Sequence, residues 1–326
     1  AVEAVATARA YAESISDGVI EQDRAGNAPV AELARLDASG LLAITVPRSL
    51  GGPGLGAPAL AEVIRTIAAV DPAIAQVPQG HFLFCDVLAV WGTARQQRAL
   101  FGEVLGGARF GNGLAARWIG VSALDDVGRL VLAFVRRDAP GVHVGDDWNV
   151  MGQRATVSGT ATFEDVPADP GLVVRYARAF EVPQQLGARA QLVHAAIQTG
   201  IAGGALRDAS EFVRTRARPF FEAATAGWAH TAGEDPHTIY RYGQLATKVR
   251  AAEALQAKAF ASDVAAEVTT DLFSLSGASA TDEKYDLSRH WRNARTHASH
   301  DPVAWKYHHV GNFMLNDVLP PNHGQL

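Results

Sequence analysis

The chain has 326 residues, which is enough for two or three domains of ordinary size. Hydrophobic residues make up 48% and charged residues 19%, a globular balance with ample material for a core. The net charge of −5 argues against nucleic acid as the main partner, and the single cysteine, Cys85, excludes an internal disulfide framework.

The first part, residues 1–107, is predicted to be helical. Its apolar residues recur at helical spacing in residues 30–42 and 60–69, on either side of the turn-rich stretch PRSLGGPGLGAP. Charged residues interrupt the N-terminus, so it does not resemble a signal peptide, and the most apolar run contains Asp86. We therefore expect a soluble, cytoplasmic protein with no membrane partner.

The second part, residues 108–182, changes to a period of two. Residues 129–137 are strand-like, and residues 155–166 alternate small or apolar residues with serine and threonine, which is typical of a half-exposed antiparallel strand. The sequence Ala139-Pro140-Gly141 predicts a turn between such strands. We expect a small β-domain here.

The third part, residues 183–326, returns to helical spacing. Gly200, Gly203 and Gly204 lie beside an apolar stripe and would let another helix approach closely. Residues 237–271 predict one long helical stretch. The last helix is predicted to begin at Asp301-Pro302, with aspartate as N-cap and proline at the first helical position.

The order of these parts is helices, a small β-region, then helices. A dinucleotide-binding fold would instead alternate strands with helices, and no GxGxxG motif is present. The sequence therefore predicts a mainly α protein with a small central β-domain.

Three stretches resemble the acyl-CoA dehydrogenase superfamily. They are GLLAITVPRSLGGPGLG, then LAFVRRDAPGVHV continuing through MGQRATVSGTATFEDV, and finally EFVRTRARPFF. They occur in the family's order and span most of the chain. The resemblance implies an N-terminal helical domain, a middle β-barrel-like domain and a C-terminal four-helix bundle, assembled as a homotetramer.

The C-terminal stretch RHWRNARTHASHDPVAWKYHHVGN resembles the flavin-dependent monooxygenase branch of that superfamily, which includes sulfone and dibenzothiophene monooxygenases. Many dehydrogenases have a Glu-Gly-Thr here whose glutamate is the catalytic base, whereas this chain has His300-Asp301-Pro302. The resemblance implies an enzyme that uses reduced flavin and O2, through a C4a-(hydro)peroxide, to oxygenate a small sulfur, nitrogen or aromatic substrate. The alternatives are an FAD-dependent acyl-CoA dehydrogenase and a flavin-binding protein without catalysis.

The resemblance also implies the cofactor and its supplier. Because no pyridine-nucleotide motif is present, we expect reduced FMN from a separate flavin reductase. FAD is the less favoured alternative, because the segment at Gly277, which would close over the flavin, has one glycine where many dehydrogenases have two or three. The family has a further strand and loop at the point where Arg117 meets Trp118, so we expect a segment to be missing there.

His297 and His300 stand three residues apart and are followed by Asp301. Such a pattern can form part of a metal site, but no third ligand has a suitable spacing, and we predict no metal. Histidines satisfied within a helix junction are the structural alternative. Imidazole also suits a proton donor near neutral pH. With the resemblance, His300 is the first catalytic candidate and His297 the second, as a partner that either supports His300 from behind or contacts the flavin.

Three further residues are candidates for the site. His81 lies in an apolar helical run, where a core histidine with a backbone partner and a catalytic histidine are equally good readings. Cys85 is one helical turn further on the same face and is interpreted as a wall of the substrate pocket, not a nucleophile. Trp148 is either a turn aromatic or another pocket wall.

The resemblance also implies flavin-binding residues. Arg216 matches an arginine that reaches a neighbouring subunit's flavin phosphate, a role suited to guanidinium. Asp301 begins a helix whose positive end would stabilise a reduced flavin. The complete set of cofactor-binding candidates is Asn112, Arg216, Gly277, Ala278, Ser279, Arg295 and Asp301.

Overall fold

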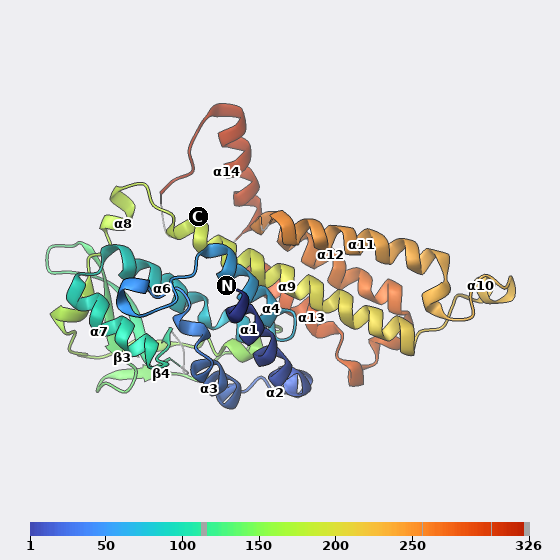
Figure 1. Ribbon diagram of the computed structural model, residues 1–326, viewed down its shortest axis with the longest axis horizontal. Coiled ribbons are helices and arrows are strands. Elements are labelled where there is room, and N and C mark those ends of the chain that lie inside the picture. The colour runs from blue at the N-terminus through green and yellow to red at the C-terminus, as the bar shows by residue number, and fades with distance from the viewer. Residues whose placement is uncertain (112–115, 256, 301, 323–326) are drawn as a thin grey trace.

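The computed structural model describes residues 1–111, 116–255, 257–300 and 302–322. Figure 1 shows a mainly helical protein in which a small sheet region lies at one end and a helical bundle extends to the other. The predicted order of helices, sheet and helices is confirmed. Asn112 and Asp301, two of the predicted binding residues, lie outside the described residues.

Two of the N-terminal helices begin at local capping signals. The Asp71 side chain accepts from the backbone N–H groups of Ala73 and Ile74 at the start of α5, and Thr93 forms a capping box with Gln96 at the start of α7. The helices of this part are α1 (Val2–Ile15), α2 (Val19–Ala25), α3 (Val30–Ala38), α4 (Ala57–Ala68), α5 (Pro72–Gln76), α6 (Pro78–Trp91) and α7 (Ala94–Leu105).

A four-stranded sheet in the order β1-β2-β3-β6 forms the middle of the chain, with a separate β4-β5 ribbon. The predicted strand at residues 129–137 is confirmed as β3, and the chain turns at Gly141, whose φ is +84°. The strands are β1 (Phe110–Gly111), β2 (Trp118–Leu124), β3 (Leu130–Arg136), β4 (Val142–Val144), β5 (Ala161–Phe163) and β6 (Val173–Val174).

The predicted strand over residues 155–166 is wrong for most of its length. Only Ala161–Phe163 forms a strand, while Arg154–Thr156 forms a 3-10 turn. Val157 has a φ of +45°, in the left-handed region. Ala155 and Val157 are buried, so packing against the helices overrides the alternating pattern.

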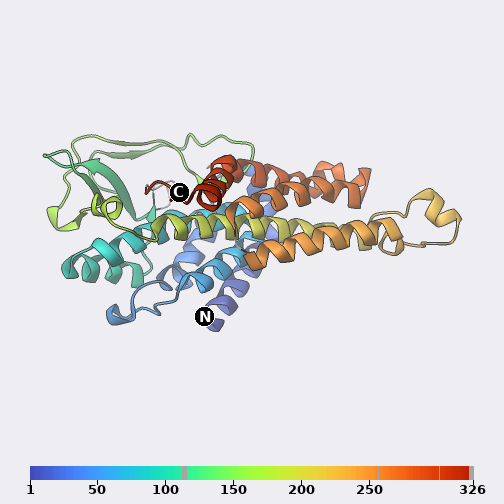
Figure 2. The same cartoon turned by 90° about the horizontal axis from the view of Figure 1, so that it is seen from above.

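The C-terminal part forms the predicted four-helix bundle from α9, α11, α12 and α13. Figure 2 shows α9 running from the sheet region along the length of the bundle. The helices of this part are α8 (Arg178–Glu181), α9 (Leu186–Thr215), α10 (Phe221–Thr225), α11 (Pro236–Leu255), α12 (Lys258–Ser276), α13 (Ser288–Ser299) and α14 (Val303–Asn316).

Two of the three glycines on α9 allow the predicted close approach. A Cβ on Gly200 would lie 2.5 Å from the Ala68 side chain, and one on Gly204 would lie 2.4 Å from the Ala69 carbonyl oxygen, so α4 packs directly on the α9 backbone. The prediction is wrong for Gly203, because nothing lies within 4 Å of a Cβ there.

Two helix predictions in this part need correction. The stretch 237–271 is divided between α11 and α12, because the chain turns back after Leu255 and α12 packs beside α11. The last helix begins at Val303, with Pro302 as its N-cap, so proline stands one position earlier than predicted.

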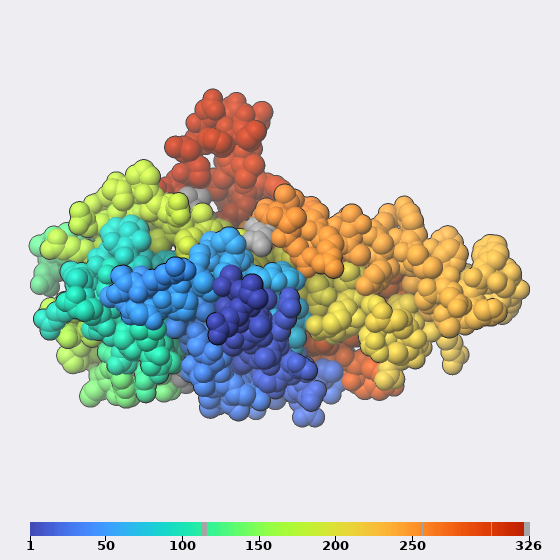
Figure 3. Space-filling model, viewed as in Figure 1, coloured from blue at the N-terminus to red at the C-terminus, as the bar shows by residue number. Residues whose placement is uncertain are grey.

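The last helix also stands clear of the body. Figure 3 shows α14 projecting from the molecule, and Tyr307, Val310 and Met314, which recur at helical spacing along it, are exposed. The Tyr307 hydroxyl donates to Asp263 Oδ2 on α12 at 2.5 Å.

One hydrophobic core joins the N-terminal helices to the bundle, since α1, α3 and α4 share it with α9 and α12. A second core lies between α6, α7 and the sheet. The segment Pro72–Trp91 is long and apolar enough to cross a membrane, but 56% of it is buried inside the protein, as in the core helix of a soluble protein.

Candidate functional site

A cavity of about 540 Å³ lies where the two helical parts and the sheet region meet. Its wall is formed by the end of α5 and start of α6, by β1, by the loop between β4 and β5, and by the end of α13. This volume is within the usual range for small-molecule and cofactor sites. His297 and His300, the two principal catalytic candidates, both line it.

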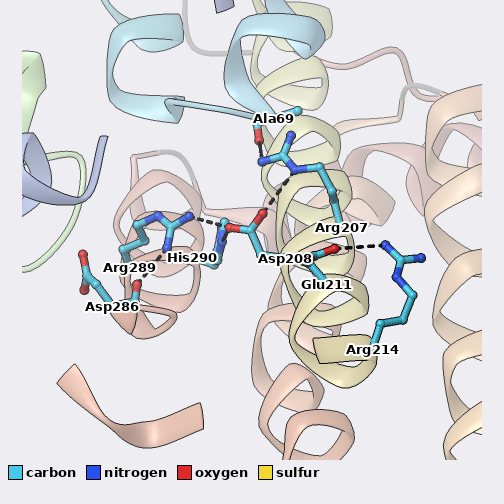
Figure 4. A network of polar contacts seen from close by, with 8 residues as sticks. All are labelled: Ala69, Arg207, Asp208, Glu211, Arg214, Asp286, Arg289 and His290. Carbon is cyan, nitrogen blue, oxygen red and sulfur yellow. Dashed lines mark hydrogen bonds and ion pairs between the residues drawn. The ribbon is translucent and has the colours of Figure 1, made fainter. Parts of the chain in front are cut away.

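A buried ionic network holds α13 against α9 (Figure 4). Asp208 on α9 accepts from the Arg289 guanidinium and, at 2.9 Å, from His290 Nε2, both on α13. Burial alone would raise the pKa of Asp208, but the hydrogen bond from His290 and the charges of His290 and Arg289 hold that pKa below its ordinary range. This network fixes the helix that carries His297.

The loop between β4 and β5 is attached to the same helix. Asn293 Oδ1 accepts the backbone N–H of Gln153 at 2.5 Å, and Arg292 Nη1 donates to Met151 O at 2.9 Å. Between them, a Cβ on Gly152 would lie 2.2 Å from the Arg292 carbonyl oxygen, so only glycine allows this approach. The loop and α13 therefore form one continuous wall.

Within that wall the backbone is strained at two positions. Gln153 and Val157 have φ values of +56° and +45°, in the left-handed region that is unfavourable for residues other than glycine and most of all for a β-branched one. The intervening Thr156 donates from its hydroxyl to Gln153 O at 2.9 Å. This conformation places Thr156 and Val157 on the cavity wall.

Three histidines from two helices gather at one side of the cavity. His194 Nδ1 on α9 lies 3.2 Å from His297 Nε2, and the His194 ring centroid lies 4.9 Å from that of His300. Gln76 Oε1, at the end of α5, lies 3.1 Å from the same Nε2. Burial, together with the charges of His194, Lys258 and His300, holds the pKa of His297 well below its ordinary value. His297 is therefore neutral at neutral pH.

Several buried polar atoms beside the cavity have no hydrogen-bond partner among the described residues. They are both amide atoms of Gln153, His297 Nδ1 and Thr296 Oγ1. All three residues line the cavity. Buried polar groups are normally paired, so these atoms indicate that a polar ligand belongs here. These atoms suit a flat ring system that carries both N–H and C=O groups, as a flavin does.

A buried cation lies at the edge of the same cavity. Arg109 is 2% exposed and its Nη1 donates to Asp37 Oδ1 at 2.7 Å. Burial lowers the pKa of Arg109 and raises that of Asp37, while their mutual attraction opposes both effects. Among the described residues that line the cavity, none is an aspartate or a glutamate.

The structure places His81 in the core and not on the cavity wall. His81 Nδ1 accepts the Phe110 N–H at 3.1 Å, and Nε2 lies 2.9 Å from the Leu42 carbonyl oxygen. Burial lowers the pKa of His81 to about 4. Both ring nitrogens are therefore used to join α6 to β1 and to the Leu42 turn, an arrangement that favours the core-histidine reading.

Cys85 lies beside His81, with 3.5 Å between Cys85 Sγ and His81 Nε2. It belongs to the core between α6 and the sheet and is not among the residues that line the cavity. Burial raises the pKa of its thiol well above the ordinary value, so the thiol is unreactive. Trp148 does line the cavity, and its indole N–H donates to Gln153 O at 3.0 Å.

Arg216 lies far from this cavity, at the end of α9. It is 22 residues beyond His194 on the same helix, a distance of roughly 33 Å at 1.5 Å per residue. Its guanidinium stacks on the Tyr285 ring at 4.9 Å and is exposed. Gly277 ends α12, the helix whose first residue, Lys258, lies near His297.

Ala278 and Ser279 follow Gly277 in a short 3-10 helix. A contact of these residues or of Arg216 with flavin therefore requires the flavin of another subunit, which the family resemblance implies for Arg216. Arg295, by contrast, is on the cavity's helix α13, where its exposed guanidinium lies 5.7 Å from the Trp291 ring centroid.

Sequence reasoning missed four residues of this site: Gln76, Arg109, Gln153 and His194. Gln76 and Arg109 carry no motif. His194 stands in an apolar helical stretch that by itself indicates packing, and Gln153 precedes the predicted strand over residues 155–166 without a motif of its own. Among the described residues, no group of three or more histidine, cysteine, aspartate or glutamate side chains is arranged to hold a metal ion.

Comparisons with family models and with individual relatives assign the chain to the same family. The N-terminal domain of acyl-CoA dehydrogenases matches residues 2–108, and their C-terminal domain matches residues 192–262 and 253–305. The dibenzothiophene monooxygenase of Mycolicibacterium goodii is 32% identical, with 93% of this chain and 91% of that protein covered. A protein named "Probable FMNH2-dependent monooxygenase SfnC", from Pseudomonas putida, is 30% identical, with 97% and 96% covered.

A solved structure of a monooxygenase has a closely similar fold. The monooxygenase TdsC of Paenibacillus sp. A11-2, solved with FMN and indole, superposes with a TM-score of 0.93 at 27% identity, covering 99% of this chain and 100% of that one. The missing segment expected after Arg117 stays a prediction.

Proposed function

The chain belongs to the acyl-CoA dehydrogenase superfamily, in its branch of flavin-dependent monooxygenases, and on that premise we propose that it oxygenates a small molecule with reduced FMN and O2. The substrate's reacting centre is a sulfur, a nitrogen or an aromatic carbon. The observation that carries this proposal is the composition of the cavity, which combines two histidines and unpartnered buried polar atoms with no carboxylate among its described lining residues.

The lining argues against the dehydrogenase alternative. Removal of an α-proton from an acyl thioester needs a positioned general base, and a carboxylate performs that role in many relatives. In the described part of the cavity wall, the ionisable side chains are Arg109, His297 and His300. Neutral His297 and exposed His300 suit the handling of a proton at an oxygen atom better than proton abstraction from carbon.

Several of the described cavity residues would bind FMN, each at a different part of the molecule. The free amide atoms of Gln153 would pair with its polar ring edge, and the buried Arg109 guanidinium, which is paired with Asp37, would lie at the edge of the same cavity. Bound reduced FMN would supply the electrons that activate O2, through the C4a-(hydro)peroxide that the family resemblance implies. Trp148 would exclude water from one side of the cavity.

His300 is proposed as the proton donor. It lines the cavity at the end of α13, and its ring packs against the buried His194 ring, which limits its freedom to turn. An imidazole held at this point can hydrogen bond to a substrate or oxygen atom and transfer a proton near neutral pH. His297, one turn earlier, contributes binding and not proton transfer, because burial keeps it neutral.

The proposal extends to the assembly and the supply of flavin. The exposed aromatic and aliphatic side chains of α14 and the distance of Arg216 from its own cavity support a homotetramer in which Arg216 reaches a neighbour's FMN. A separate flavin reductase would provide the reduced FMN, in the cytoplasm. FAD remains the alternative cofactor, and indole and dibenzothiophene are suitable first substrates because they occur in the names of relatives.

One experiment tests the proposed function directly. Protein loaded anaerobically with reduced FMN is mixed rapidly with O2, with and without dibenzothiophene or indole, and flavin absorbance and oxygenated product are followed. We expect a flavin–oxygen adduct that outlives the one formed in free solution, and product formation that requires protein. Flavin reoxidation at the rate of free reduced FMN, with no oxygenated product from a panel of heteroaromatic compounds, would contradict the proposal.

A further inference from the structure

His297 has one ring nitrogen with two neighbours and one with none among the described residues. Nε2 lies 3.1 Å from Gln76 Oε1 and 3.2 Å from His194 Nδ1, whereas Nδ1 is buried without a partner. The side chain is 3% exposed and lines the cavity. A neutral imidazole carries a single N–H, so its two nitrogens must play opposite roles.

Gln76 decides which nitrogen carries that proton. An amide oxygen has lone pairs and no hydrogen, so a contact of 3.1 Å from Gln76 Oε1 is favourable only if His297 Nε2 is the N–H. His194 Nδ1, which then carries no proton of its own, accepts a hydrogen bond from the same N–H or lies beside it. With the proton on Nε2, Nδ1 is left with a lone pair.

We propose that Gln76 fixes His297 in the Nε2–H form, so that His297 Nδ1 is a buried acceptor for an N–H or O–H group of the molecule bound in the cavity. This inference rests on the proposed function and specifies its ligand: His297 selects for a hydrogen-bond donor, whereas His300 provides one. A buried acceptor left without a donor is costly, so a ligand with a correctly placed N–H binds more tightly than an isostere without it.

Two donors could fill this position. One is the N–H of an aromatic nitrogen heterocycle serving as substrate. The other is the N5–H of reduced flavin, which oxidised flavin lacks. The shared chemistry is a flat ring system that carries an N–H, and the experiment below separates the two sources.

The first measurement needs no catalysis. Nitrogen NMR of protein containing 15N-labelled histidine distinguishes the two neutral forms of imidazole, and His297→Gln identifies the His297 signals by their loss. We expect a neutral His297 protonated on Nε2 at neutral pH. In Gln76→Leu the Nδ1–H form should gain population, Gln76→Glu should retain Nε2–H, and Gln79→Leu, on the same wall, should leave the signals unchanged.

The second measurement compares matched ligands by their dissociation constants. Indole and benzothiophene differ mainly in N–H against sulfur, and reduced and oxidised FMN differ at N5. If the substrate is the donor, the preference of the wild type for indole over benzothiophene should fall roughly 2- to 10-fold in His297→Leu, as expected for one lost hydrogen bond. If flavin is the donor, the preference for reduced over oxidised FMN should fall instead.

A His297 protonated on Nδ1, or charged, would overturn the inference whatever the enzyme's activity. So would ligand preferences that His297→Leu leaves unchanged for both pairs. Failure of the proposed function has a different signature, namely the expected tautomer and ligand preference without any oxygenated product.

Discussion

Asn293 and Gln153 are 140 residues apart in the sequence, and the Asn293 Oδ1 accepts the Gln153 backbone N–H at 2.5 Å. Both residues are nearly fully buried, and the bond holds the strained loop against α13. It thus joins the loop that carries Gln153 to the helix that carries His297 in one continuous cavity wall.

Asn293→Ala should therefore loosen the cavity as well as destabilise the fold. The substitution leaves a buried N–H without an acceptor, which costs about 1–3 kcal/mol of unfolding free energy. We expect weaker FMN binding together with a lower thermal midpoint. Asn293→Asp retains an acceptor oxygen at this position and should lose less FMN affinity than Asn293→Ala; equal FMN affinity in all three proteins would contradict the structural role assigned to this bond.

His300→Ala separates proton donation from flavin binding. Reduced FMN should still bind, because Gln153 and His297 are untouched, but oxygenation should fall about 10²- to 10⁴-fold, the usual effect of losing a positioned proton donor. Oxygen uptake should continue and release hydrogen peroxide. The measurement is the ratio of oxygenated product to O2 consumed.

His300→Glu tests the dehydrogenase alternative at the same position. It introduces a carboxylate where many relatives have their base, yet a carboxylate at neutral pH donates no hydrogen bond. We expect its product-to-oxygen ratio to be as low as that of His300→Ala. Wild-type coupling in His300→Ala would show that the proton donor lies elsewhere.

Arg216→Ala should weaken FMN binding only in the assembled protein. Loss of a charge-assisted contact with the phosphate should cost about 1.5–3 kcal/mol of binding free energy. Arg214→Ala is the matched control, because Arg214 is exposed and pairs with Glu211 on its own helix. Titration with FMN, together with light scattering to measure the assembly, checks this prediction; an unchanged dissociation constant in an intact tetramer would place Arg216 outside the flavin site.

Asp71 makes the stability of the fold depend on pH. Burial, with some contribution from Asp23, raises its pKa to about 6, against the backbone hydrogen bonds from Ile74 and Ala73, which lower it. A raised pKa in the folded state means that its stabilising effect is complete below about pH 4 and is lost as pH rises through 6. The wild type should lose up to about 3 kcal/mol of unfolding free energy over this window.

Asp71→Asn keeps an N-cap side chain and removes the ionisation. We expect it to unfold at a higher denaturant concentration than the wild type at pH 8, with the difference gone at pH 4. Asp169→Asn is the control, since Asp169 caps the Gly171 N–H from an exposed position. Parallel pH profiles for wild type and Asp71→Asn would show that Asp71 ionises normally.

The sequence alone determined the order of helical and strand regions, the β3 strand and the family. Asp71, Thr93 and the glycines of α9 act through neighbours a few residues away or through the missing Cβ itself, so their effects are visible in a local pattern. The stretch from Arg289 to Asn312 indicated the monooxygenase branch and the importance of His297 and His300 for the same reason, since it is one continuous segment.

Only the tertiary structure decided which residues complete the site. Gln76 meets His297 across 221 residues, His194 meets it across 103, and Gln153 meets Asn293 across 140. No local pattern records such pairs. The same contacts override the alternation of residues 155–160, because burying Ala155 and Val157 and satisfying the Gln153 N–H against α13 outweigh the intrinsic preference of that segment for an extended strand.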